Sequence, residues 1–222
     1  MTMELPSRIP IFPLPDTVFF PGGVLPLHVF EARYRTMVAD HLPGARVMGM
    51  ILLEPGWQED YYGSPAAYSV GCAGPMEEVT RLPDGRYTLQ VHGRWKFEVV
   101  RYLQTEPYRM AEVRVLTERQ ADESLVSVQQ AKTRLLGAYT VLASALEGRP
   151  SNPFTFDPSL DYARLVNLAC MHLGIAAEEK QRLLELHDVD ERGSRIIRVL
   201  EQEYQRVARL QALRGDDETS IH

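Results

Sequence analysis

A long alternation of apolar and polar side chains over residues 86–100 constrains the fold more than any other feature. The apolar phase holds Tyr87, Leu89, Val91, Trp95, Phe97 and Val99. A period of two predicts a β-strand with one solvated face, interrupted only at Gly93. Residues 82–85 (LPDG), directly before it, have the composition of a tight turn. Residues 68–81 should therefore pair back on this strand as a hairpin.

Other short strands are expected on both sides of the hairpin. Residues 24–29 and 110–116 resemble strands, and residues 46–53 are apolar on both faces, as in a fully buried strand. Within the hairpin the apolar phase slips around Gly74 and Pro75, which indicates a bulge or a barrel corner. Short strands with glycine corners favour a closed or half-closed β-barrel over a flat sheet.

Helical periodicity follows the first strands and dominates the C-terminal part. A short helix is expected after residue 29, with Phe30, Tyr34, Met37 and Val38 on its apolar face. Later helices are expected over residues 125–146, from an N-cap at Asp157 to Gly174, over residues 176–187, and over a last apolar stripe that ends near Leu213. The predicted class is α+β, with a β-rich domain over residues 1–118, a helical domain over residues 119–213 and a disordered tail over residues 214–222.

Composition excludes several classes of protein. The 222 residues are 45% hydrophobic and 24% charged, as in an ordinary globular protein, and the formal net charge is −6. No apolar run approaches the roughly 20 residues that cross a bilayer, and the N-terminus does not resemble a signal peptide. We therefore expect a cytoplasmic protein with no membrane partner. Cys72 and Cys170 show no metal-ligand or disulfide spacing and are expected to be buried thiols.

The motifs of several enzyme classes are missing. The three lysines follow Trp95, Ala131 and Glu179, so no Gly-Lys phosphate loop exists, and neither GxGxxG nor GxSxG occurs. The histidines have no metal-ligand spacing. No catalytic residue, cofactor or metal is predicted, and the chain is not expected to be an enzyme. A hydrolase built on a serine and a lysine stays open as an alternative.

Two features indicate binding. The loop over residues 54–67 carries Trp57, Tyr61 and Tyr62 among prolines and glycines, and such rings serve equally as a contact surface or as a lid on the barrel. Phe19 and Phe20 precede a Pro-Gly-Gly turn, which can leave a strand edge or apolar groove open to an extended peptide. All five aromatic residues are candidate peptide contacts.

Several blocks of the sequence resemble the LON N-terminal, or LON substrate-binding, domain family. The opening blocks are residues 9–14 (IPIFPL), 18–31 (VFFPGGVLPLHVFE) and 33–35 (RYR). Later blocks follow in the family's order, at residues 70–74 (VGCAG), 82–86 (LPDGR) and 93–97 (GRWKF). The resemblance covers residues 8–213, and Lys96 stands where the family usually has arginine.

The resemblance implies a PUA-like β pseudo-barrel followed by a helical bundle. It also implies a stand-alone member without ATPase or protease domains, whose function is to bind unfolded or extended polypeptide, with a protease or chaperone as a further partner. RNA binding is the alternative, suggested by the PUA-like fold and a basic strand face of Arg86, His92, Arg94 and Lys96. The acidic total makes a nucleic-acid partner the weaker expectation. The oligomeric state is not predicted.

Overall fold

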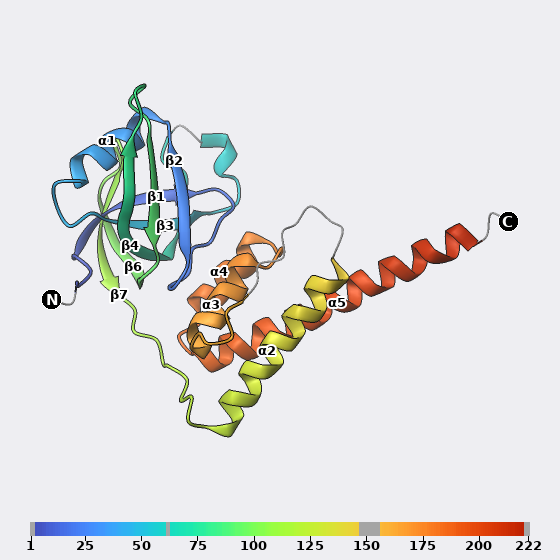
Figure 1. The fold of residues 1–222 in the computed structure, drawn as a ribbon. Helices are drawn as coiled ribbons and strands as arrows, with labels where there is room; N and C mark the ends of the chain where they lie inside the picture. The colour runs from blue at the N-terminus through green and yellow to red at the C-terminus, as the bar shows by residue number, and fades with distance from the viewer. Residues whose placement is uncertain (1–2, 61–62, 147–155, 220–222) are drawn as a thin grey trace. The chain divides into compact units, whose positions relative to one another are not determined.

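The computed structural model describes residues 3–60, 63–146 and 156–219, with side chains described as far as residue 211. The chain forms two compact units (Figure 1). A β-rich unit comprises residues 1–118 and 175–187, and a helical unit comprises residues 119–174 and 188–222. The first border between the two units falls after residue 118. Residues 175–187, which the sequence places with the helices, cluster instead with the strands.

Seven strands build the β-rich unit: β1 (Arg8–Leu14), β2 (Val24–Val29), β3 (Val47–Leu53), β4 (Ala67–Arg81), β5 (Tyr87–His92), β6 (Trp95–Gln104) and β7 (Arg109–Val115). The pairing runs β4–β3–β1–β7–β6 and returns to β4, so these strands close into a barrel. Only the β1–β3 pairing is parallel among the described strands. The predicted barrel and the α+β class are both confirmed.

The long hairpin is present, and β4 pairs with both halves of the returning chain. Met76 in β4 pairs with Val91 in β5, whereas Ala73 in β4 pairs with Trp95 in β6. Gly93 lies in the break between β5 and β6. The backbone passes close to the preceding turn here, since a β-carbon at this position would lie 2.4 Å from the carbonyl oxygen of Phe20. Glycine is therefore required where the ribbon turns from the barrel to the outer β2–β5 pair.

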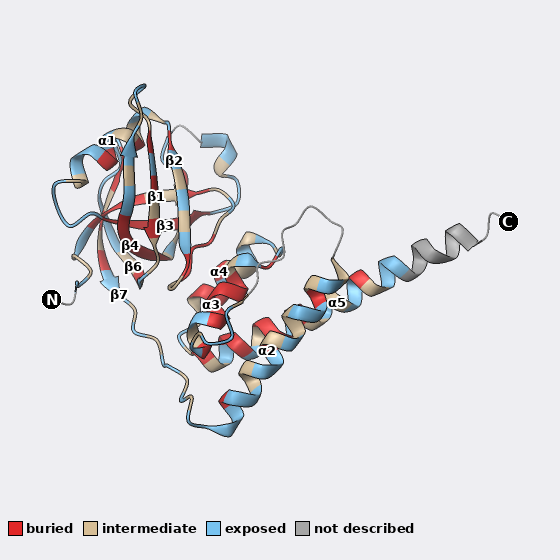
Figure 2. Ribbon diagram, in the orientation of Figure 1, coloured by how far each residue is buried: buried red, intermediate tan, exposed pale blue. Residues whose placement is uncertain are grey.

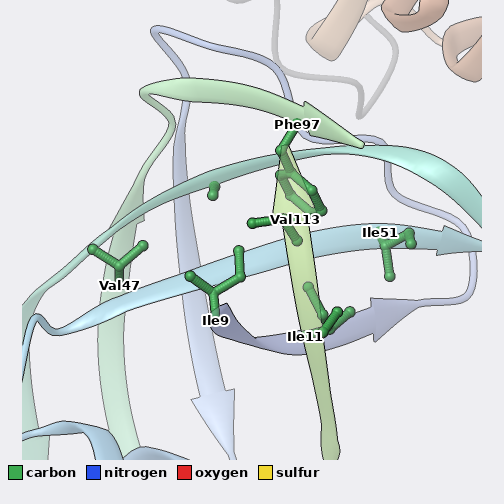
Figure 3. Close-up of a cluster of buried hydrophobic side chains, with 8 residues drawn as sticks. Ile9, Ile11, Val47, Ile51, Phe97 and Val113 are labelled. Atoms are coloured by element: carbon green, nitrogen blue, oxygen red, sulfur yellow. The ribbon is translucent and has the colours of Figure 1, made fainter. Parts of the chain in front are cut away.

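Apolar side chains from the closed strands fill the barrel (Figure 3). The buried cluster contains Ile9, Ile11, Val47, Ile51, Ala73, Phe97, Ala111 and Val113. All seven residues of β3 are buried, as its two-faced apolar sequence predicts (Figure 2). Gly49 and Gly71 leave room beside Phe97: a β-carbon at either position would lie less than 3.0 Å from the Phe97 ring.

Within the β-rich unit, polar contacts join helix α4 (Ala177–Glu185) and the residue after it to the barrel strands. The amide of Gln181 donates a hydrogen bond of 3.0 Å to the carbonyl oxygen of Val70. The ammonium of Lys96 donates one of 2.7 Å to the carbonyl oxygen of Leu186 and lies 3.4 Å from Glu118. Lys96 is 2% exposed, so these acceptors replace the water that a buried cation loses.

The helical unit contains α2 (Val126–Ala145), α3 (Tyr162–His172) and α5 (Val189–Thr219). Helix α3 begins later than predicted, because Asp161 and not Asp157 is its N-cap and accepts a 2.7 Å hydrogen bond from the backbone N–H of Arg164. Asp157 instead accepts from the N–H of Ser159 in a turn. Both aspartates satisfy nearby N–H groups, so composition alone did not separate cap from turn.

Helix α5 continues to Thr219, whereas the sequence predicted a disordered tail from residue 214. Residue 215 is a glycine and two aspartates follow it, which weaken a helix, but the stretch contains no proline, so nothing in the local sequence forces the helix to stop. Residues 220–222 of the predicted tail lie outside the described residues. Within the part of α5 whose side chains are described, residues 189–211, the buried positions include Arg192, Ile196 and Leu200 (Figure 2).

Candidate functional site

The turn after Phe19 and Phe20 is closed within the chain. Both phenylalanines are buried, at 2% and 0% exposure, so they are part of the core and not of the surface. The N–H of Gly22 donates 2.8 Å to the carbonyl oxygen of Gly93, and the N–H of Gly93 donates 2.9 Å to that of Gly23. The backbone that the sequence suggested as an open edge for a peptide is thus already hydrogen-bonded at this turn. The two phenylalanine side chains pack in the core.

The aromatic loop is described only in part. Trp57 opens a 3-10 helix, η1 (Trp57–Asp60), and its side chain is half-buried while the three residues after it are exposed. Tyr61 and Tyr62 lie outside the described residues. The role of this loop as contact surface or lid stays a prediction.

The basic strand face expected for RNA does not form. Lys96 is buried against Leu186 and Glu118. The remaining basic side chains have neighbours of their own: Arg86 pairs with Asp84, His92 lies 3.5 Å from Glu77, and the guanidinium of Arg94 lies 5.5 Å from the centre of the Trp95 ring. The alternation correctly predicted the two faces of β5, but in β6 it placed Lys96 on the solvated face, where the side chain is in fact buried. It did not show that α4 packs near the face that carries Lys96.

The β-rich unit instead contains a pocket of about 170 Å³ beside the start of α1 (Ala32–His41), which we call the aromatic pocket. Its walls come from β1, from the start of α1 and the residues just before it, and from the last residue of β3. The loop between η1 and β4 and the connection from β6 to β7 complete them. The lining residues are Phe12, Pro13, Pro15, Phe30, Glu31, Arg33, Tyr34, Leu53, Gly63, Pro65, Thr105, Pro107, Tyr108 and Arg109. Rings and prolines dominate this wall.

Tyr34 is the centre of a stack on one wall of the aromatic pocket. The Phe12 ring lies 4.3 Å from the Tyr34 ring with 29° between their planes, and the Arg33 guanidinium lies 4.6 Å from the centre of the Tyr34 ring. The Arg33 Nε donates 3.0 Å to Glu31 Oε2. Because aromatic, cation–π and ionic contacts converge here, the rings are held in place before any ligand arrives.

Tyr108 and Arg109, which also line the pocket, are held by contacts of their own. The Tyr108 hydroxyl donates 2.9 Å to Asp40, and burial together with this carboxylate raises the pKa of Tyr108 to about 12. Arg109 is buried, donates 2.5 Å to the carbonyl oxygen of Pro65 and lies 5.5 Å from the centre of the Tyr102 ring. A cation thus forms part of an otherwise apolar wall.

Phe30 presents its ring to solvent at the aromatic pocket. The sequence placed it on the buried face of the helix, but α1 begins at Ala32 after the N-cap Glu31, so Phe30 lies outside the helical period. Its exposed fraction is 61%, the largest among the exposed aromatic residues of the described chain. An exposed ring beside an apolar pocket is a common feature of binding surfaces.

Metal and thiol chemistry find little support at the described positions. Across residues 3–60, 63–146 and 156–219, no three His, Cys, Asp or Glu side chains gather as they would around a metal ion. Cys72 and Cys170 are buried free thiols, as predicted, and burial raises the pKa of Cys72. A thiol whose ionised form is disfavoured is a poor nucleophile.

Comparison with known proteins assigns the family. The model of the ATP-dependent protease La (LON) substrate-binding domain matches residues 8–202. The chain belongs to the LON substrate-binding domain family. The family assignment from the opening and later sequence blocks is therefore confirmed, and the aromatic pocket is a feature of a LON substrate-binding domain. Within the described residues, no helix is both long and apolar enough to cross a membrane.

Curated relatives are much longer than this chain. A Lon protease of Dictyoglomus thermophilum is 28% identical over 203 residues, which make up 91% of this chain and 25% of the relative. A Lon protease of Flavobacterium johnsoniae is 26% identical over 209 residues, with 92% and 25% covered. The LON-family chain described here thus spans about a quarter of the length of the curated relatives it matches.

Solved structures show the same fold at low identity. A Lon N-terminal domain protein from Xanthomonas campestris superposes with a TM-score of 0.62 at 22% identity, covering 86% of this chain and 97% of the other. The N-terminal domain of a Mycobacterium avium complex Lon protease gives 0.59 at 19% identity, covering 89% and 98%. These likenesses establish the LON N-terminal fold.

Proposed function

We propose that this chain is a non-catalytic recognition module of the cytoplasm that binds exposed segments of unfolded polypeptide and works with a protease or chaperone. The observation that carries the proposal is the aromatic pocket with Phe30 at its mouth, found in a member of a substrate-binding domain family. Folded proteins bury most of their large apolar side chains, whereas unfolded chains expose them. An apolar pocket open to solvent therefore distinguishes the two states of a client.

The candidate contacts divide by position. Trp57, Tyr61 and Tyr62 remain proposed peptide contacts on their loop. Phe19 and Phe20 act indirectly, since their burial stabilises the turn that joins Gly22 to Gly93. Phe30 is added as a direct contact because its ring is exposed at the aromatic pocket.

The non-catalytic role is supported by the sequence. It contains no Gly-Lys phosphate loop and no GxSxG motif. The burial of Lys96 removes one cation from the face that suggested RNA, and the net charge of −6 opposes binding to a phosphate backbone. Polypeptide binding is therefore preferred over both alternatives.

The experiment compares an unfolded protein with its folded counterpart. We would measure binding of the full chain to reduced, carboxymethylated lactalbumin and to native lactalbumin by fluorescence anisotropy. Binding to the unfolded form alone is the expected result, and no difference between the two forms contradicts the proposal. A parallel titration with single-stranded RNA over increasing salt, and assays of ATP and casein hydrolysis, test the two alternatives directly.

A further inference from the structure

We infer that strand β2 is an open edge of the sheet and that Pro26 prevents it from pairing with the same strand of a second copy of this chain. The inference goes beyond the proposed function, because it concerns self-association and not the binding of a client. It is carried by the direction of the backbone groups of β2, the position of Pro26 among them and the uncharged sequence of the strand.

Strand β2 is the last strand on its side of the sheet. It pairs with β5 and, among the described strands, with no other. The side chains of Val24, Pro26 and His28 are exposed, with 41% of Val24 accessible to solvent. Across the described residues, no hydrogen bond from outside the sheet reaches the backbone of these three positions. The edge is therefore open along this part of β2.

The turn beside β2 shows which backbone groups face the open edge. Gly23 and Gly93 stand one step beyond the pair of Val24 with His92, and the N–H of Gly93 donates 2.9 Å to the carbonyl oxygen of Gly23. Hydrogen-bonded and non-hydrogen-bonded pairs alternate along an antiparallel ladder, and the β2–β5 register contains no shift. The N–H and C=O groups of Val24 and of every second residue after it therefore point away from β5.

Pro26 lies in the middle of this outward-facing set. Its ring carbon Cδ occupies the place where another residue would present an N–H, so an added strand would meet a methylene group opposite its carbonyl oxygen. Val24 and His28 still offer N–H groups, but these lie on the two sides of the proline, about 13 Å apart along the strand. An added strand that reached both would have to pass the proline ring and would lose its central hydrogen bond.

Proline is the protective feature that the strand itself contains. Exposed edges are commonly protected by charged side chains, by bulges or by very short strands. The six residues of β2 (VLPLHV) include no Asp, Glu, Lys or Arg, and their register with β5 is regular. Apart from the proline, the strand is apolar and uncharged, which is the composition that promotes pairing between strands of different chains.

A second copy of β2 is the strand that fits this edge. In an antiparallel pair with two-fold symmetry about residue 26, Val24 of one copy faces His28 of the second copy, and residue 26 faces itself. The outer pairs can form their hydrogen bonds, whereas the central pair brings two proline rings together. Pro26→Val supplies the missing N–H groups and completes the central pair.

The test compares the mass of the full chain with that of Pro26→Val by light scattering over a range of concentrations. Pro26→Val should raise the mass to about twice that of the wild type, since a two-fold pair closes on itself. Pro83→Val is the matched control, because it places the same side chain at an exposed position in the turn between β4 and β5. Equal masses for Pro26→Val and the wild type, with a native circular dichroism spectrum, would overturn the inference.

A proline moved along the same edge separates the backbone effect from the added side chain. Residue 28 also faces outward, so Pro26→Val combined with His28→Pro should return the mass to that of the wild type. A pair that survives the moved proline would show that contacts other than the β2 edge hold it, and would contradict the inference.

Hydrogen exchange on the wild type tests the edge without any substitution. The amides of Val24 and His28 should exchange about tenfold faster or more than those of Leu25 and Leu27, because only the second two face β5. This measurement decides the inference if Pro26→Val does not fold. Equal protection of the two sets of amides would show that the edge is covered, and the inference would then be wrong.

Discussion

The ring of Phe97 in β6 occupies the space that a side chain at Gly49 in β3 would need. A β-carbon at Gly49 would lie 2.8 Å from Cζ of Phe97 and 2.9 Å from Cδ1 of both Ile9 and Ile11. Real β-carbons do not approach other atoms so closely, and a barrel this narrow has room for either the ring or the extra side chain. The Phe97 ring therefore fits in the barrel only because residue 49 has no side chain.

Gly49→Ala should destabilise the β-rich unit by about 1–3 kcal/mol, because the added methyl group overpacks the barrel. Phe97→Leu in the same chain should recover part of that loss, although Phe97→Leu alone is destabilising. Urea denaturation of the two single variants and the double variant measures the coupling. Additive costs would contradict the packing relationship.

Gly44→Ala is the matched control in the same unit. The nearest described atom to a β-carbon there is the His41 carbonyl oxygen at 3.9 Å, so the methyl group meets no obstacle. We expect no loss of stability, and a gain of up to about 1 kcal/mol from a less flexible unfolded chain.

Lys96→Met should cost about 3–5 kcal/mol, because it leaves Glu118 and the Leu186 carbonyl without their buried cation. Hydrogen exchange should show the loss first in the amides of α4, which Lys96 holds to the barrel. Arg101→Met is the control, since its pair with Glu112 is exposed and worth less than about 1 kcal/mol. Equal effects of the two substitutions would show that Lys96 is an ordinary surface charge.

Stability should fall in alkaline solution through Tyr108. Its pKa rises from 10.0 to about 12 on folding, so the folded state favours the protonated hydroxyl. The resulting stabilisation is complete below about pH 10 and is lost as the pH rises toward 12. Tyr108→Phe should make the unfolding midpoint less dependent on pH in this window, measured by urea titrations from pH 9 to about 12. An unchanged slope would refute the assignment.

The aromatic loop gives a prediction that separates binding from folding. Replacing Trp57, Tyr61 and Tyr62 by alanine should leave the melting temperature nearly unchanged and weaken binding to unfolded lactalbumin, with a cost of about 2 kcal/mol or more for each true anchor. Calorimetry and anisotropy on the same sample measure both quantities. A melting temperature several degrees lower with unchanged affinity would identify the loop as a lid.

Local sequence patterns predicted the elements better than the site. The alternation and turn of the hairpin, and the two-faced apolar run of β3, depend on neighbouring residues and were found correctly. Phe30 was misplaced because its spacing from Tyr34 matches a helical turn, although the helix begins at Ala32. The burial of Lys96 could not be predicted locally, because its hydrogen-bond acceptor Leu186, at the end of α4, lies 90 residues later in the sequence.

The aromatic pocket carried no signal that a single stretch of sequence could show. Its walls come from β1, the start of α1, the loop before β4 and the β6–β7 connection, so only the closed barrel brings Phe12, Tyr34 and Tyr108 together. The aromatic residues that were chosen instead share a loop or a turn. Clustering in sequence is a local property, whereas this pocket is formed by long-range packing.

The assignment of α4 to the β-rich unit has a consequence for synthesis on the ribosome. All seven strands lie before residue 116, yet the unit includes residues 175–187. While the intervening helices are being made, the Lys96 ammonium can pair with Glu118 but has no Leu186 carbonyl to bind, and the nascent barrel lacks its contacts with α4. The β-rich unit is therefore complete only after about 90 further residues beyond Lys96 have emerged. A chain that ends before them contains all the barrel strands but lacks α4.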